Sequence, residues 1–374
     1  MRWIRKDSRE GGLPVRIRLW LPLALSLICL FSTGCQSLQH VSLEPQFKNP
    51  LAQYSSWGWT GFRSPFSSEN SRLVTLDDYQ PGKIPIVFVH GLLATPHTWT
   101  EMTTALHADP EIADRYQIWV FEYSTGISYL QSASVLRKEL QDIVQKLDPQ
   151  GNDPALQNMV LVGHSMGGLL VKQMVSTSEN KMWEALSDQP FEFVEADPET
   201  KQQIREAMFF EPLPFVSRAV FIATPHTGSD WVNRPIGSLG RNMIAFPSKV
   251  QGQYRKLISN NSGLLKEHYL NSIPTSLDHL APGDPIIVAL SELKISARVP
   301  YHSIIGIKQS RFSTETGDGV VEEASAHIPG SSSELVIPAT HTTIQKSEQA
   351  TNEVRNILHL HLNKVDQGQY LPLR

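Results

Sequence analysis

The most constraining feature of this chain is a glycine-flanked serine, because it requires a particular order of strand, turn and helix. Residues 158–168 read Asn-Met-Val-Leu-Val-Gly-His-Ser-Met-Gly-Gly, and an apolar helical pattern follows at once. This order predicts a strand, a sharp turn and a helix, in which Gly163 and Gly167 leave room for the turn and the Ser165 hydroxyl is pushed outwards. The first amides of the helix then favour negative charge beside Ser165. Ser165 is therefore a candidate nucleophile, although a plain tight turn has the same pattern.

Further apolar runs predict the sheet to which this turn belongs. Five more runs have the length and composition of strands, and they occupy residues 84–89, 116–123, 218–223, 301–307 and 334–337. Helical patterns alternate with them, as in residues 134–147 and in the segment after the last strand. Alternation of this kind predicts an α/β fold with a doubly wound, mostly parallel sheet.

Two connections are far longer than the usual few residues between elements. They cover residues 176–216 and 231–300, and both leave the same edge of the sheet as Ser165. In the second, residues 247–258 and 263–270 have helical patterns, and Asp284 before a proline predicts the start of another helix. We expect helical cap insertions over the site and a lid function for residues 231–300.

A base for Ser165 should lie just after a strand, because ligands bind at the carboxyl ends of strands in an open parallel sheet. His341 directly follows the predicted strand 334–337 and is the candidate base. His327, in a loop, is its rival. His302 opens a strand and so lies at the wrong end.

Three other histidines are assigned no chemistry. His359 and His361 are two residues apart on the last helix, cannot face one another, and are interpreted as surface residues. His164 lies inside the turn and is expected to point away from Ser165.

The candidate acid is Asp318, in the sequence Gly-Asp-Gly after the predicted strand 301–307. Its role would be to hold His341 in one tautomer and to stabilise the imidazolium ion. Asp230, just after the strand 218–223, is the second candidate, and an Asp-Gly turn is the structural alternative for Asp318.

The strand 84–89 ends in His90-Gly91-Leu92. Gly91 would let the backbone turn back over the sheet, so that the Leu92 amide points at a reacting carbonyl oxygen. A glycine turn without this role remains the alternative.

The amino terminus predicts export. Residues 1–34 hold six basic and two acidic residues, and an apolar stretch at 19–31 precedes Ser-Thr-Gly-Cys. The stretch is too short to span a bilayer and matches the core of a signal peptide. Small residues before Cys35 resemble a bacterial lipoprotein signal, in which that cysteine is acylated. An ordinary signal peptide and an uncleaved anchor are the alternatives.

The resemblance to a lipoprotein signal implies a mature protein at a membrane surface of the bacterial cell envelope, with the outer membrane as the expected location. Acyl chains on Cys35 would anchor it there. Residues 35–72 then form a tether or extension whose aromatic residues pack on the domain or at the membrane, residues 73–364 form the main domain, and residues 365–374 form a tail.

Composition excludes several other classes. The formal charge is −4, and since residues 1–34 carry +4, the remainder carries −8, which argues against nucleic acid as a partner. The only cysteines are Cys29 and Cys35, so the main domain has neither a disulfide nor a thiolate metal site. We expect no metal and no cofactor.

Five motifs together resemble an α/β-hydrolase of the bacterial lipase and serine-esterase type. They are Val89-His90-Gly91, residues 163–168, residues 223–229 (Ala-Thr-Pro-His-Thr-Gly-Ser), residues 317–321 (Gly-Asp-Gly-Val-Val) and His341. The resemblance covers roughly residues 73–364, and residues 81–85 and 121–126 resemble a largely uncharacterised, lipoprotein-like branch of that superfamily. It implies ester hydrolysis through an acyl-enzyme, with oxyanion donors at Leu92 and Met166.

The expected function is therefore hydrolysis of acyl or lipid-like carboxylic esters by Ser165, His341 and Asp318. Two alternatives remain open: acyl transfer to an alcohol on the same fold, and a catalytically silent hydrolase fold that binds lipid or assembles at the surface. The sequence leaves the oligomeric state and the acyl chain length undetermined.

Overall fold

The computed structural model describes residues 50–53, 62–63, 71–234, 244, 246–270, 273–308 and 316–369. The predicted signal segment 1–34, Cys35, most of the extension 35–72 and the end of the tail lie outside the described residues. Within the described parts of the chain, no helix is both long enough and apolar enough to cross a membrane.

The centre of the fold is a seven-stranded sheet with the order β1-β3-β2-β4-β5-β6-β7. All neighbouring strands from β3 to β7 pair in parallel, and the short β1 pairs antiparallel with β3 at the edge. This confirms the predicted doubly wound, mostly parallel sheet and adds β1, which the sequence did not predict. The strands are β1 (Arg72–Thr75), β2 (Ile84–Val89), β3 (Tyr116–Glu122), β4 (Met159–His164), β5 (Val216–Ile222), β6 (Tyr301–Gly306) and β7 (Ser333–Ile337).

Both faces of the sheet are buried, which explains why the central strands are apolar without alternation. In β2, Val87 and Val89 belong to one hydrophobic cluster, whereas Ile86 and Phe88 belong to the other. Phe62 of the extension is also buried in the first cluster, so this aromatic residue packs on the domain, which is one of the two expected positions.

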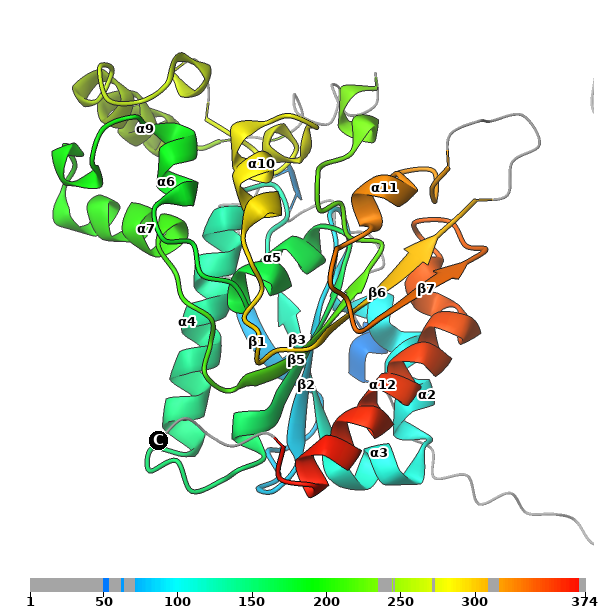
Figure 1. Ribbon diagram of the computed structural model, residues 1–374. Helices are drawn as coiled ribbons and strands as arrows, with labels where there is room; N and C mark the ends of the chain where they lie inside the picture. Colours follow the sequence, from blue (N-terminus) through cyan, green and yellow to red (C-terminus); the bar gives the residue numbers. More distant parts are fainter. Residues whose placement is uncertain are drawn as a thin grey trace, which may run out of the picture. The chain divides into compact units, whose positions relative to one another are not determined.

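Helices cover the two faces from opposite sides (Figure 1). One face is covered by α4 (Tyr129–Leu147) and α5 (Met166–Met174), and the other by α2 (Thr100–His107), α3 (Pro110–Arg115) and α12 (Glu348–Asp366). Helix α5 starts directly after β4, so its amino terminus lies at the carboxyl end of the sheet.

The described parts of the two insertions, residues 176–216 and 231–300, form one cap and pack on each other (Figure 1). The first contains α6 (Lys181–Leu186), η4 (Phe191–Phe193) and α7 (Pro198–Met208), and the second contains α9 (Ser248–Asn260), η6 (Glu267–Tyr269), η7 (Asp278–Leu280) and α10 (Pro285–Glu292). Ser187 and Leu265 form an antiparallel bridge between them. The first insertion ends one residue earlier than predicted, because β5 already begins at Val216.

The predicted helix over residues 263–270 is wrong. Leu265 pairs with Ser187 instead, and the Lys266 amide donates to the Leu186 carbonyl oxygen at 2.9 Å, so this backbone joins the first insertion and only the short η6 forms. The other two predictions for this insertion hold. Helix α9 forms over Ser248–Asn260, and Asp284 accepts a hydrogen bond from the Ile286 amide at the start of α10.

Candidate active site

Ser165 occupies the turn between β4 and α5 with a φ of 55°, a left-handed conformation that only a tightly packed turn maintains. Its amide donates to the Ile222 carbonyl oxygen of β5 at 2.9 Å. The flanking glycines are required sterically, since a Cβ on Gly163 would lie 2.6 Å from the Gly168 Cα and one on Gly167 would lie 2.3 Å from the Val89 oxygen. The packing therefore fixes Ser165 at the carboxyl end of the sheet.

His341 lies in the loop after β7, and its side chain reaches across to Ser165. The distance between His341 Nε2 and Ser165 Oγ is 2.8 Å. Both residues are largely buried, with 8% and 7% of their surface exposed. The serine hydroxyl can therefore donate its proton to Nε2 without an intervening water.

Asp318 lies in the loop after β6 and contacts the other ring nitrogen of His341. Its Oδ2 is 2.6 Å from His341 Nδ1, while its Oδ1 accepts from the amides of Val320 and Val321 at 2.9 and 2.8 Å. The His341 amide also donates to the Asp318 carbonyl oxygen at 3.1 Å. A carboxylate on Nδ1 fixes the tautomer that leaves Nε2 free to accept a proton.

The rival candidates lie elsewhere. Asp230 is exposed on η5 (Asp230–Asn233) and has no contact with His341. His327 is exposed and pairs with Glu334 at 2.8 Å. His302, at the amino end of β6, contacts Ser333 at 2.8 Å. The structure therefore brings together Ser165, His341 and Asp318, and none of the alternatives.

The surface position predicted for His361 is wrong. Its Nδ1 lies 2.9 Å from the Tyr116 hydroxyl and its Nε2 lies 3.0 Å from the Ser217 hydroxyl, and no part of the residue is exposed. His361 thus joins α12 to the amino ends of β3 and β5. His359 is partly exposed, as predicted, and pairs with Asp109 and Glu111.

His164 lies beside the candidate base His341, a position that the sequence did not predict. Its Nε2 lies 3.0 Å from the carbonyl oxygen of His341, and the two rings are 5.0 Å apart. Burial, together with the neighbouring His341 and His90, lowers the pKa of His164 well below its usual value. The ring is therefore neutral, with its hydrogen on Nε2, because a carbonyl oxygen can only accept.

The turn after β2 lies directly on the serine. A Cβ on Gly91 would fall 2.8 Å from the Ser165 Cβ, so only glycine allows this approach. No described residue accepts a hydrogen bond from the amides of Leu92 or Met166. The Leu93 amide instead donates to the Thr125 hydroxyl at 3.2 Å, which holds the turn in place. Two unsatisfied amides beside Ser165 are suited to binding an oxyanion.

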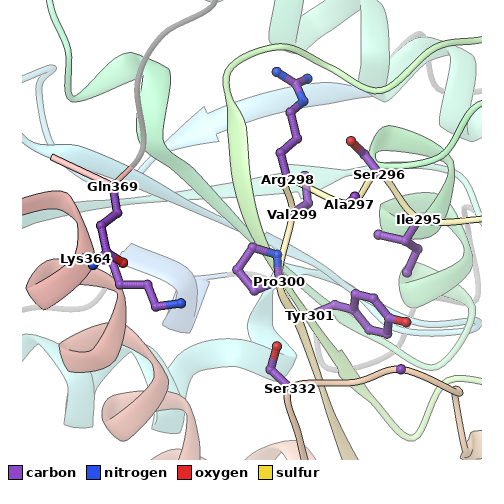
Figure 2. A pocket seen from close by; sticks show the side chains of 11 residues that line it. Ile295, Ser296, Ala297, Arg298, Val299, Pro300, Tyr301, Ser332, Lys364 and Gln369 are labelled. Atoms are coloured by element: carbon purple, nitrogen blue, oxygen red, sulfur yellow. The ribbon is translucent and has the colours of Figure 1, made fainter.

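The described residues hold no metal centre, and one further pocket lies away from Ser165. Within the described residues, no set of three or more histidine, cysteine, aspartate or glutamate side chains is arranged to hold an ion. A pocket of about 480 Å³, shown in Figure 2, is lined by Arg298, Tyr301, Ser332 and Lys364. It lies at the amino end of β6 and so at the opposite end of the parallel sheet from Ser165.

Comparison with known proteins finds one matching family model and several similar solved structures. A model of the alpha/beta hydrolase family matches residues 86–283. Among solved structures, the mature lipase BlEst2 from Bacillus licheniformis is 16% identical with a TM-score of 0.46, covering 79% of this chain and 99% of that chain. EstA from Clostridium botulinum is 14% identical with a TM-score of 0.45, covering 75% and 88%. The metagenomic carboxyl esterase MGS0156 is 20% identical with a TM-score of 0.37, covering 76% and 77%. Among curated proteins, none matches the sequence.

Proposed function

Because the chain belongs to the alpha/beta hydrolase family, we propose that it is a serine hydrolase that cleaves carboxylic esters of the acyl or lipid-like class. The observation that carries the proposal is the contact of 2.8 Å between Ser165 Oγ and His341 Nε2. A serine on a sharp turn, paired with a histidine that a buried carboxylate orients, is the arrangement that activates a hydroxyl group for acyl transfer.

In the proposed mechanism, Ser165 Oγ attacks the ester carbonyl carbon while its proton passes to His341 Nε2. The amides of Leu92 and Met166 stabilise the tetrahedral oxyanion. His341 then gives the proton to the leaving alcohol, and the acyl group stays on Ser165. Water enters, loses a proton to His341 and attacks the acyl-enzyme, which releases the carboxylic acid and restores the Ser165 hydroxyl. Asp318 remains ionised and stabilises the imidazolium ion in both halves.

Labelling with a fluorophosphonate, combined with hydrolysis of p-nitrophenyl esters of graded acyl length, tests this proposal. We expect labelling at Ser165, and we expect Ser165→Ala to abolish labelling and to lower kcat by about 10⁴ to 10⁶. Labelling that persists in Ser165→Ala would assign the nucleophile to another residue. Absence of both labelling and turnover in the native protein would instead support a catalytically silent fold.

Acyl transfer and hydrolysis differ in the molecule that accepts the acyl group from Ser165, an alcohol in the first and water in the second. When glycerol is added to the ester assay, a hydrolase releases the free carboxylic acid as its main product. An acyltransferase forms the glycerol ester in its place, so the product ratio decides between the two activities.

We also propose that the mature protein is anchored at a membrane surface of the bacterial cell envelope through acylated Cys35. The support is the sequence alone: a basic start, a short apolar stretch and small residues before the cysteine. Acyl or lipid esters of the same membrane would then be the substrates within reach.

A further inference from the structure

The cap carries a large, mainly apolar cavity that is partly open to solvent and that the proposed mechanism does not use. Its volume is about 1220 Å³, and it lies among α6, α7, α9 and the start of α4. Most of its lining is apolar, and its walls include Trp183, Ile204, Met208, Leu257 and Leu265. None of Ser165, Asp318 and His341 lines it. Its size and apolar lining are those of a site for a small organic ligand.

One polar side chain in the wall is held in a defined orientation. His279 on η7 lines the cavity, and its Nδ1 lies 3.3 Å from Asp284 Oδ1. Both residues are almost fully buried, with 4% and 6% of their surface exposed. Asp284 also accepts from the Ile286 amide at 2.9 Å, so its carboxylate is fixed at the start of α10.

The carboxylate of Asp284 takes Nδ1 of His279, so Nε2 is the ring nitrogen that remains for another partner. In the tautomer with the Nδ1 hydrogen directed at Asp284, Nε2 is the nitrogen that can accept a hydrogen bond. No described residue forms a hydrogen bond with this Nε2. His279 thus presents a hydrogen-bond acceptor in an otherwise mainly apolar wall.

We propose that this cavity binds a single-chain amphiphile with a hydroxyl head group, the apolar chain lying along the walls and the hydroxyl group donating to Nε2 of His279. A hydroxyl group suits the site better than a carboxylate because Asp284 places a negative charge behind the ring. The cavity lining also carries Glu195, Asp197 and Glu199 against Lys249 and Lys256, an excess of acidic groups. The site is distinct from the catalytic triad of the proposed function.

Calorimetry with 1-O-dodecylglycerol tests the proposal, because an ether cannot be hydrolysed and binding is then measured whether or not the protein is an esterase. The matched ligand is the same ether with both hydroxyl groups methylated. We expect the native protein to bind the dihydroxy ether about 3- to 10-fold more tightly than the methylated one, the range of one net hydrogen bond. His279→Leu should remove this difference, and His279→Gln, which keeps an acceptor, should restore part of it.

Variants of the walls test where the chain binds. Leu257→Trp on α9 and Ile204→Trp on α7 fill the cavity from two sides and should weaken binding of both ethers. Arg255→Trp is the matched control, because Arg255 is an exposed residue of α9 that does not line the cavity. Equal affinity of the native protein for both ethers would overturn the role of His279. Unchanged binding by both filled variants, with native circular dichroism, would overturn the site itself.

Discussion

The ring of His164 donates a hydrogen bond to the main-chain carbonyl oxygen of His341, over a distance of 3.0 Å. The residue before the candidate nucleophile therefore holds the loop that carries the candidate base. Because β4 ends at His164 and Ser165 follows it, the bond links the positions of Ser165 and His341 directly. We therefore expect His164 to act in the proposed reaction as a positioning residue, through His341.

This relationship predicts that His164→Leu lowers kcat for ester hydrolysis by about 10- to 100-fold, because small displacements of a catalytic group are costly. KM should change little, since the His164 side chain is buried and points its Nε2 at the His341 carbonyl oxygen. His164→Gln can still donate to the carbonyl oxygen and should recover part of the rate. Steady-state kinetics of both variants, with the fluorophosphonate labelling rate as a second readout, provide the check. Equal loss in both variants would assign His164 a packing role only.

Asp318→Asn should impair turnover far more than Asp230→Asn. In the first variant, the new side-chain amide would present a donor or a neutral acceptor to His341 Nδ1, and the tautomer and the imidazolium ion would lose their support. We expect a decrease in kcat of about 10³ to 10⁴ for Asp318→Asn and near-native kinetics for Asp230→Asn. Parallel steady-state kinetics of the two variants measure the difference. The opposite ranking would identify Asp230 as the acid.

The protein should lose stability steeply as the pH falls below about 6.5. Desolvation is the main cause that lowers the pKa values of five buried histidines. The pKa of His90 is lowered to about 4 and that of His302 to about 3. The pKa values of His164, His226 and His361 lie well below the usual value. The unfolded chain binds protons in this range and the folded protein does not, so each group contributes about 1.4 kcal/mol of lost stability per pH unit.

Urea unfolding at pH 7, 6 and 5 measures this slope. His226→Leu should reduce the slope of the free energy of unfolding against pH by the contribution of about one proton. Both ring nitrogens of His226 are buried without a hydrogen-bond partner among the described residues. His327→Gln, at an exposed position, serves as the control. A free energy of unfolding that does not fall between pH 7 and pH 5 would contradict the prediction.

Lys172 predicts a further rise of stability with pH on the alkaline side. Burial lowers its pKa to about 8, and its Nζ donates to the Ser291 carbonyl oxygen at 3.0 Å. Below pH 8 the fold holds a buried charge, and above it the folded protein releases the proton while the unfolded chain keeps it up to about pH 10.5. The free energy of unfolding should therefore rise by about 2 kcal/mol from pH 7 to pH 9.5 through this group. Comparison with Lys172→Met isolates the contribution: the rise should be absent from the variant.

Cys35→Ser should leave the mature protein unacylated, because Cys29 lies within the predicted signal segment and no other cysteine is present. Mass spectrometry of the mature amino terminus, with membrane fractionation of the native and variant proteins, measures this. Cleavage at another position, with Cys35 unmodified or removed, would contradict the lipoprotein proposal.

The positions of the candidate triad could be predicted because each residue follows a strand in the sequence. Ser165 follows β4, Asp318 follows β6 and His341 follows β7, and in a parallel sheet all carboxyl ends lie at one edge. This rule needs only the strand order along the chain. It therefore identifies the loops that the structure brings together, without any knowledge of side-chain contacts.

Contacts between distant segments could not be predicted in this way. The spacing of His361 to His359 predicts a surface position, but burial on α12 depends on how that helix crosses the strand ends. The cap cavity is formed by two insertions, and η7 brings His279 to its wall through packing that no local pattern records. The failed helix at residues 263–270 has the same cause, since pairing with Ser187 overrides the local helical preference.

The hydrogen bond between Ser165 and His341 joins residues that are 176 positions apart in the chain. Contacts of such long sequence separation form late, because a large loop must close before they can contribute. A chain that refolds from denaturant should therefore recover its helical circular dichroism before it reacts with a fluorophosphonate. Probe reactivity then follows the last steps of folding, whereas the circular dichroism signal follows the earlier ones.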